Sequence, residues 1–168
     1  MNIESSFEIS FVLPCLNESE SLAYCIKQIQ ELISKESLSA EIIVADNNST
    51  DGSAEIVRDL GAKVILETNK GYGSAISAGV KHASGHYVLV ADADGSYDFN
   101  YAPVFINKLR QGYLYVQGCR MPSGGGEIKA EAMPFLHRYF GNPVLSFLTR
   151  FLFNTKIRDV HCGMRAFD

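Results

Sequence analysis

The chain has 168 residues, of which 46% are hydrophobic and 20% are charged, and its net charge is −4. This is the composition of about one soluble domain with a buried core, and the acidic balance gives no basic footprint for nucleic acid. An anionic substrate would need a metal cation between itself and so many carboxylates. We expect no transmembrane helix and no signal peptide, because no stretch reaches ~20 apolar residues and the first residues lack an apolar region.

The cysteines are scattered along the chain and none stands in a CxxC pair. This spacing supports neither a zinc site nor a disulfide framework, so we expect reduced thiols in a cytoplasmic protein. The four are Cys15, Cys25, Cys119 and Cys162.

Strand patterns alternate with helix patterns along the chain. Residues 8–13 predict a buried strand that Pro14 ends, and Asn17 with Glu20 predicts a capping box for the helix that follows. Alternation of this kind predicts an α/β fold with a mostly parallel sheet flanked by helices. The further predicted strands are 41–45, 63–66, 86–91 and 114–117, and the further helices begin near Asp51, Gly73 and Asn100.

A polar cluster follows each of the first four predicted strands. The carboxyl ends of parallel strands share one edge of a sheet, and ligands bind at that edge. Four loops that meet there predict a ligand site. The clusters are residues 14–18, 46–51, 69–73 and 92–94.

Asp92 and Asp94 are separated only by Ala93, and in an extended segment their side chains would share a face. Two carboxylates so close repel each other unless a cation lies between them or one is protonated. Oxygen ligands favour Mg²⁺ or Mn²⁺, and Mg²⁺ commonly binds one or two carboxylates together with substrate phosphates. The alternative is a simple turn at Asp94 and Gly95 after the strand. The position at the sheet edge favours the metal.

Other candidate residues have both a functional and a structural interpretation. Asp46, at the tip of a buried strand, could accept hydrogen bonds from a base or ribose, whereas Asp51 is typical of a helix start. Gly71 and Gly73 would let a ligand approach the backbone closely, or would serve a turn. Arg120 could pair with phosphate or be a solvated charge. The run 159–165 joins an acid, an imidazole and a guanidinium, which suits a base and an anion clamp.

With these clusters in order, the chain resembles a family 2 glycosyltransferase of GT-A fold, closest to the polyprenyl-phosphate (dolichol-phosphate) sugar transferases. The matching stretches are FVLPCLNE, IIVADNNSTDGS, NKGYGSAISAGVKHASGHYVLVADADGS, GCR and DVHCGMRAF. The resemblance implies a nucleotide-sugar donor, a divalent cation (Mg²⁺ or Mn²⁺), and a lipid-phosphate acceptor at the cytoplasmic face of a membrane. It does not identify the sugar, the base or the oligomeric state.

The resemblance also implies roles for particular residues. It places Pro14, Asn17, Glu18, Gly71 and Gly73 in the donor pocket. It assigns Asp46 to recognition of the base, and Asp92 and Asp94 to the metal and the sugar diphosphate. It assigns Arg120 and Arg165 to phosphates of the donor or the lipid acceptor. Asp159 would be the acid near the acceptor or the base of an inverting displacement.

The chain departs from the family pattern at two positions and in its length. Many relatives have two adjacent acids where Asp46 is followed by Asn47, and many carry Gln where Ser96 stands, so base recognition and a third metal contact are open. We expect one GT-A catalytic domain over residues 1–168, with a nucleotide-sugar half to about residue 118 and an incomplete acceptor half over 119–168. A fragment that binds donor without catalysis is therefore an alternative function.

Residues 140–153 are rich in Phe and Leu and carry few charges. One interpretation is an interfacial helix that presents the site to a lipid acceptor. The other is a helix that covers the sheet or docks onto a part of the protein beyond this sequence.

Two other enzyme classes are less well supported. VADADGS matches the haloacid-dehalogenase-type phosphatases, but that motif normally opens its fold, and here three strand–helix units precede it. A dinucleotide-dependent oxidoreductase would need GxGxxG after the first strand, where PCLNE stands instead.

Overall fold

The computed structural model describes residues 6–122 and 140–168. The chain divides into two compact units. The first unit consists of Met1–Val116 together with Met164–Asp168, and the second consists of Gln117–Gly163. The last residues of the chain therefore belong to the first unit, whereas the sequence analysis assigned them to the acceptor half. The reason is a strand near the C-terminus that joins the sheet of the first unit.

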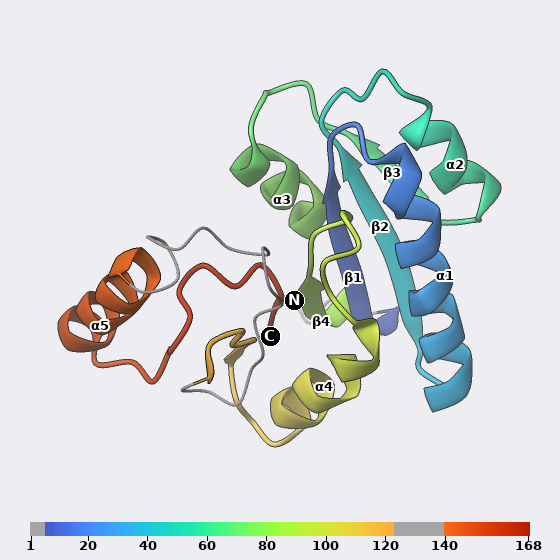
Figure 1. Cartoon of the computed structure of the whole chain (residues 1–168). Coiled ribbons are helices and arrows are strands. Elements are labelled where there is room, and N and C mark those ends of the chain that lie inside the picture. The colour runs from blue at the N-terminus through green and yellow to red at the C-terminus, as the bar shows by residue number, and fades with distance from the viewer. Residues whose placement is uncertain (1–5, 123–139) are drawn as a thin grey trace. The chain divides into compact units, whose positions relative to one another are not determined.

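The first unit is built on a six-stranded sheet with the order β3-β2-β1-β4-β6-β5. The β1–β2, β2–β3 and β1–β4 pairs are parallel, and β4–β6 is antiparallel. Figure 1 shows α3 on one side of β1 and β2, with α1 and α2 on the other. The strands are β1 Phe7–Cys15, β2 Ala40–Asp46, β3 Lys63–Leu66, β4 Gly85–Val90, β5 Tyr115–Gln117 and β6 Arg165–Phe167. The helices are α1 Ser19–Glu36, α2 Ser53–Asp59, α3 Tyr72–Lys81, the 3₁₀ helix η1 Phe99–Tyr101, α4 Ala102–Arg110 and, in the second unit, α5 Asn142–Phe153.

The sheet confirms the predicted α/β class, with two differences in its strands. β1 continues through Pro14 to Cys15 on its β2 side, whereas its pairing with β4 stops at Val12. Pro14 has no amide hydrogen, so it is tolerated where only one neighbouring strand is paired. β6 was not predicted, because a three-residue strand in the run 159–167 carries no readable alternation.

Two predicted helix caps are wrong. Asn17 adopts a left-handed backbone, with φ of 57°, and its side chain accepts a hydrogen bond from the amide of Thr50 instead of capping α1. Asp98, not Asn100, caps η1, because its carboxylate accepts the amide of Asn100 at 2.9 Å. The first amide of α1, at Ser19, instead donates to the carboxylate of Asp51 in the loop after β2.

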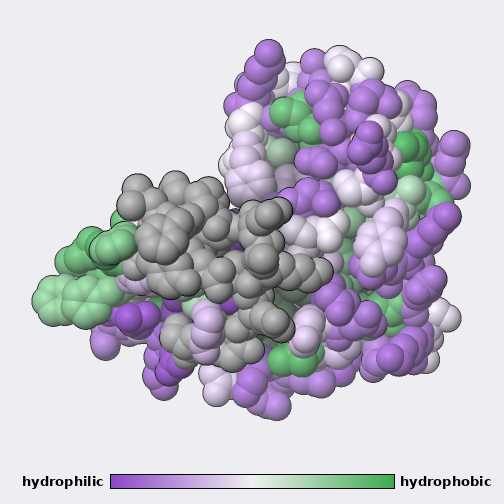
Figure 2. Space-filling model, in the orientation of Figure 1, coloured by the Kyte–Doolittle hydropathy of each residue, from purple (hydrophilic) through white to green (hydrophobic). Residues whose placement is uncertain are grey.

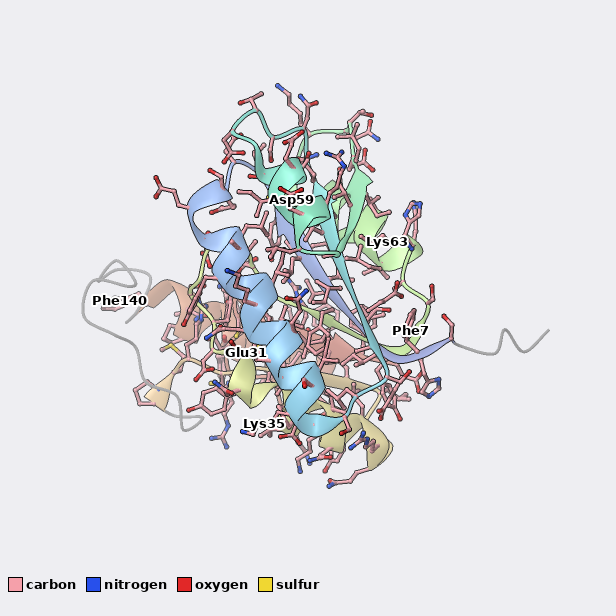
Figure 3. The ribbon with its side chains drawn as sticks, turned by 90° about the vertical axis from the view of Figure 1, so that its right-hand side faces the viewer. Phe7, Glu31, Lys35, Asp59, Lys63 and Phe140 are labelled. Atoms are coloured by element: carbon pink, nitrogen blue, oxygen red, sulfur yellow. The ribbon has the colours of Figure 1, made fainter. Side chains whose placement is uncertain are left out.

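α1 is amphipathic, and its apolar face packs onto the rest of the unit. Glu31 and Lys35, one turn apart, lie on its exposed face (Figure 3). The buried residues of α1 are Leu22, Cys25, Ile26, Ile29 and Leu32.

The opposite face of the sheet is covered by α3, which approaches β1 closely. Val12, Ile43 and Val90 form a buried cluster there, with Ile76 of α3 packed against it. Gly79 makes the close approach possible, because a Cβ at this position would collide with the side chain of Val12. Glycine is therefore required at this point for packing rather than for its backbone angles.

We expect Gly79→Ala to lower the free energy of unfolding by about 1–3 kcal/mol, because the added methyl overpacks the contact with β1. Gly73→Ala is the matched control in the same helix, since a Cβ there would meet nothing within 4 Å. It should be neutral or stabilising by up to about 1 kcal/mol. Urea unfolding of the two variants measures the difference, and equal midpoints would refute the tight packing of α3 on β1.

Candidate functional site

Two loops at the carboxyl edge of the sheet are tied to each other by side chains. The backbone amide of Asn17 donates to the hydroxyl of Ser49 at 2.9 Å. The side-chain oxygen of Asn17 accepts the backbone amide of Thr50 at 2.9 Å. The amide of Glu18 donates to the hydroxyl of Ser53 at 3.2 Å. The loops after β1 and β2 therefore form one cross-linked platform, with Pro14 at its base.

Asp51 serves two helices at once. Its carboxylate accepts the amide of Ser19 at 2.9 Å, at the start of α1, and the amide of Ser53 at 3.1 Å, at the start of α2. The bonds from Ser53 and Ser19 hold the pKa of Asp51 well below its ordinary value. This confirms Asp51 as a helix-start residue, and it adds α1 to the helices that it serves.

Asp46 lies at the end of β2 and is almost fully buried, with 3% of its surface exposed. Its Oδ1 accepts the amide of Ser49 at 3.1 Å, so the carboxylate turns toward its own loop. Its carbonyl accepts the amide of Glu67 at 2.8 Å, which joins this loop to the one after β3. A base-reading role for Asp46 stays a prediction.

The loop that carries Asp92 and Asp94 is anchored through the residue between them. β4 ends at Val90, so the two acids lie in a loop and not in an extended strand. Ala93 is buried, and its carbonyl accepts the hydroxyl of Ser21 at 2.7 Å and the thiol of Cys25 at 3.4 Å. α1 thus holds the backbone of this loop at Ala93, and Asp92 and Asp94 are the residues immediately before and after it.

The two acids have different partners. Tyr72, the first residue of α3, donates its hydroxyl to Oδ1 of Asp92 at 2.7 Å. Burial and the bond to Asp92 raise the pKa of Tyr72 to about 12, so the phenol stays protonated at neutral pH. Oδ1 of Asp94 accepts the amide of Ser96 at 2.9 Å, and Gly95 has a φ of 76°. The turn interpretation of Asp94 is therefore correct, and its metal role stays a prediction.

A third acid shares the electric field of this pair. Burial raises the pKa of Glu18, and the nearby charge of Asp94 raises it further, with smaller contributions from Asp51 and Asp92. A cation placed among Glu18, Asp92 and Asp94 would relieve this repulsion. Over residues 6–122 and 140–168, however, no three His, Cys, Asp or Glu side chains are close enough to hold an ion by themselves. The metal role of Asp92 and Asp94 stays a prediction, and it would need further ligands such as the phosphate oxygens of a substrate.

Arg165 supplies the positive charge at this edge. β6 pairs Arg165 with Val90, two residues before Asp92, and its Nη2 lies 3.5 Å from the hydroxyl of Tyr72. Its Nε is buried and, within the described part of the chain, has no hydrogen-bond partner. A buried donor of this kind costs about 1–3 kcal/mol unless it is satisfied, and an anion would satisfy it.

The other two candidate residues, Arg120 and Asp159, meet in the second unit. Nε and Nη2 of Arg120 donate to the two oxygens of Asp159 at 2.9 and 3.0 Å, and the backbone amide of Arg120 adds a bond of 3.0 Å. Asn142 donates to the same carboxylate at 2.6 Å, and Asp159 is 0% exposed. Burial would raise the pKa of Asp159, but the bonds from Arg120 and Asn142 outweigh it and hold the pKa below its ordinary value.

This geometry argues against Asp159 as a base. A general base must reach the proton that it abstracts, and a buried carboxylate with four donors around it has little affinity for a proton. The arrangement instead makes Asp159 the residue that fixes the guanidinium of Arg120, whose side chain is 33% exposed.

α5, also in the second unit, buries polar side chains and exposes apolar ones, the reverse of an ordinary amphipathic helix. Asn142 and Ser146 are buried, and the hydroxyl of Ser146 accepts the amide of Val160 at 3.1 Å. The apolar side chains are exposed, and Figure 2 shows them as a green group at the left of the view. They are Val144, Leu145, Phe147, Leu148, Phe151, Leu152 and Phe153.

Comparison with known proteins identifies the family and supports the fold. The Glycosyl transferase family 2 model matches residues 10–168, so the chain belongs to that family. This membership also removes the phosphatase and oxidoreductase alternatives. Solved GT-A structures share the fold: glucosyl-3-phosphoglycerate synthase from Mycobacterium tuberculosis, in complex with Mn²⁺, UDP and glucosyl-3-phosphoglycerate, superposes with a TM-score of 0.72 at 22% identity over 99% of this chain and 58% of that one. Mannosyl-3-phosphoglycerate synthase from Rubrobacter xylanophilus gives 0.73 at 22% identity over 96% and 53%.

Two curated relatives come from Haloferax volcanii. The low-salt glycan biosynthesis hexosyltransferase Agl6 is 36% identical over 95% of this chain, and a dolichyl-phosphate hexose transferase is 32% identical over 95%. The chain spans 38% of the length of the first and 66% of the second.

We expect Asp159→Asn to lower the stability of the protein at neutral pH by about 2–4 kcal/mol, because the amide cannot accept all the bonds that the carboxylate accepts. The folded-state pKa of Asp159 lies below the unfolded-state value, so its contribution is present above the unfolded-state pKa and is lost as the pH falls. The cost of the substitution should therefore shrink in acid.

Thermal unfolding at several pH values measures this effect. Asp98→Asn is the control, because Asp98 is exposed and asparagine is an equally good cap. A pH-independent cost for Asp159→Asn would contradict an ionised Asp159.

Proposed function

We propose that this chain carries the donor site of a glycosyltransferase that transfers a sugar from a nucleoside diphosphate to the phosphate of a polyprenyl lipid, with inversion at the anomeric carbon. The observation that carries the proposal is the edge of the sheet, where Glu18, Asp92 and Asp94 share one field and the buried Nε of Arg165 has no hydrogen-bond partner in residues 6–122 and 140–168. A metal-bound diphosphate supplies both of the charges that this edge needs.

The donor would lie along the cross-linked loops. Asp92 and Asp94 would hold the cation, and Arg165 would bind a phosphate oxygen. Pro14, Asn17 and Glu18 would line the nucleotide pocket with Asp46, and Gly71 and Gly73 would admit the donor close to the backbone. Gly73 suits that role because nothing lies within 4 Å of a Cβ placed there. The UDP and Mn²⁺ in the solved M. tuberculosis enzyme support this choice of donor and metal.

In the proposed reaction, an oxygen of the acceptor phosphate forms a bond to the anomeric carbon of the sugar. The bond from that carbon to the diphosphate breaks, and the leaving nucleoside diphosphate keeps the electron pair. Bound Mg²⁺ or Mn²⁺ would neutralise the charge on that leaving group. A phosphate monoester is already ionised at neutral pH, so the reaction needs no strong base, in agreement with the burial of Asp159.

A lipid acceptor is supported by α5 and by the dolichyl-phosphate hexose transferase relative. Phe147 and Phe151 stack with ring centroids 6.4 Å apart on the exposed apolar side of the helix. Residues 140–158 contain three cations and no acid, namely Arg150, Lys156 and Arg158. Exposed apolar side chains with basic neighbours fit an anionic membrane surface. None of the helices in the described ranges has the length and apolar character to cross a bilayer, so the proposed contact is with the surface.

Asp92→Asn and Asp94→Asn should each weaken Mn²⁺-dependent binding of UDP- or GDP-sugars at least about 10-fold, because each removes a charge from the cation site. Calorimetric titration with and without Mn²⁺ measures the loss. Asp59→Asn is the control, since Asp59 is an exposed acid on α2 (Figure 3). Unchanged affinity in both site variants would refute the metal site, and metal-dependent binding without release of nucleoside diphosphate would favour the non-catalytic alternative.

Replacing Phe151 and Leu152 by serine should reduce co-flotation with vesicles of anionic lipid and polyprenyl phosphate more than about 10-fold, because two large apolar side chains no longer enter the interface. Leu114→Ser is the control, since Leu114 is an equally exposed leucine of the first unit, with 74% of its surface accessible. Absence of the wild-type protein from the floating fraction would refute the membrane contact.

A further inference from the structure

Asn47, one residue beyond β2, holds the loop between β3 and α3 by three hydrogen bonds. Its Nδ2 donates to the carbonyls of Glu67 at 2.9 Å and Asn69 at 2.8 Å, and its Oδ1 accepts the amide of Gly71 at 2.7 Å. The residue is 5% exposed. Its own amide donates to the carbonyl of Cys15 at 2.8 Å, so its backbone is fixed to the end of β1.

Only a carboxamide can make this set of bonds. It offers two N–H donors and one acceptor oxygen at the same time, whereas an ionised carboxylate accepts only. An aspartate at position 47 would place negative charge against the two carbonyls of Glu67 and Asn69. Asn47 is thus the point where the chain departs from relatives with two adjacent acids, and the structure gives that departure a physical function.

The loop that Asn47 holds leads directly to Asp92. Gly71 has a φ of 130° and precedes the first turn of α3, where its carbonyl accepts the amides of Ser74 and Ala75 at 3.0 and 3.1 Å. Tyr72 follows, and its hydroxyl donates to Asp92. Asn47 therefore fixes the backbone of Gly71, and this in turn sets the position of the Tyr72 hydroxyl that donates to Asp92.

We propose that Asn47 is a positioning residue that locks the β3–α3 loop, so that Tyr72 orients Asp92 for a metal-bound nucleoside diphosphate. The proposal rests on the proposed donor role of this edge. It assigns position 47 to loop geometry and not to the base. It also gives Tyr72, to which the sequence pattern assigned no role, a part in the site.

Asn47→Asp should accelerate hydrogen exchange at the Gly71 amide at least about 10-fold and should weaken Mn²⁺–UDP and Mn²⁺–GDP binding about 10-fold, because second-sphere supports of a metal site have effects of this size. Asn107→Asp is the control. Asn107 is exposed on α4, and its side-chain oxygen accepts Nη1 of Arg110 at 3.2 Å, a bond that aspartate can also accept, so both readouts should stay at the wild-type value. Should Asn47→Asp fail to fold, Asn47→Ala removes both donor bonds and also the acceptor for the Gly71 amide, without adding a charge.

A double-variant cycle separates this role from general stabilisation. Tyr72→Phe should weaken Mn²⁺–nucleotide binding without accelerating exchange at Gly71, and Tyr101→Phe, at an exposed tyrosine, should do neither. Asn47→Ala with Tyr72→Phe should bind within about twofold of the weaker single variant, because the two residues act in series. Fully multiplicative losses, or unchanged exchange at Gly71 in both Asn47 variants, would overturn the proposal. If the wild-type chain binds no nucleotide, the proposed function fails, while the exchange readout still tests the lock.

Discussion

The hydrogen-bond ladder of the central strands is the constraint on which the rest of the structure depends. β1 pairs in parallel with β2 as far as Cys15, but with β4 only as far as Val12. β1 therefore separates from β4 before Pro14. This is the point where the order of the strands across the sheet reverses. Parallel pairing also brings the loops after β1, β2, β3 and β4 to one edge. The candidate residues that follow β1 to β4 are at this edge as a consequence, and Arg165 reaches it through the antiparallel pairing of β6 with β4.

Like charges gather at this edge of the sheet beside a buried guanidinium nitrogen. Burial raises the pKa of Glu18, and the charge of Asp94 raises it further, while Nε of Arg165 has no hydrogen-bond partner among the residues that the structure describes. Such sites are costly to stability, and they persist where binding compensates the cost. A cation and an anion that bind together would meet both charges, which is the reason for proposing a metal-bound diphosphate at this edge.

The second unit is held together by a buried polar network. Among its described residues, Asp159, Arg120 and Asn142 form a hydrogen-bonded network around a fully buried carboxylate. α5 buries Asn142 and Ser146 and exposes its aromatic side chains. A network of this kind is stable only while every member is satisfied, which argues for a structural role of Asp159.

The sequence by itself determined the α/β class, all four parallel strands and the loops that carry the site, because hydrophobic periodicity and turn residues act within a few residues of each other. It also determined the role of Asp51 at a helix start. Only the tertiary structure decided the partners of each side chain. β6, with Arg165, joins the sheet through pairing with β4, a segment far away in the chain. Asn47 and Tyr72 lie in polar clusters that the sequence located, but their hydrogen-bond partners belong to distant parts of the chain. Long-range contacts of this kind leave no local periodicity, so the sequence pattern did not identify those partners.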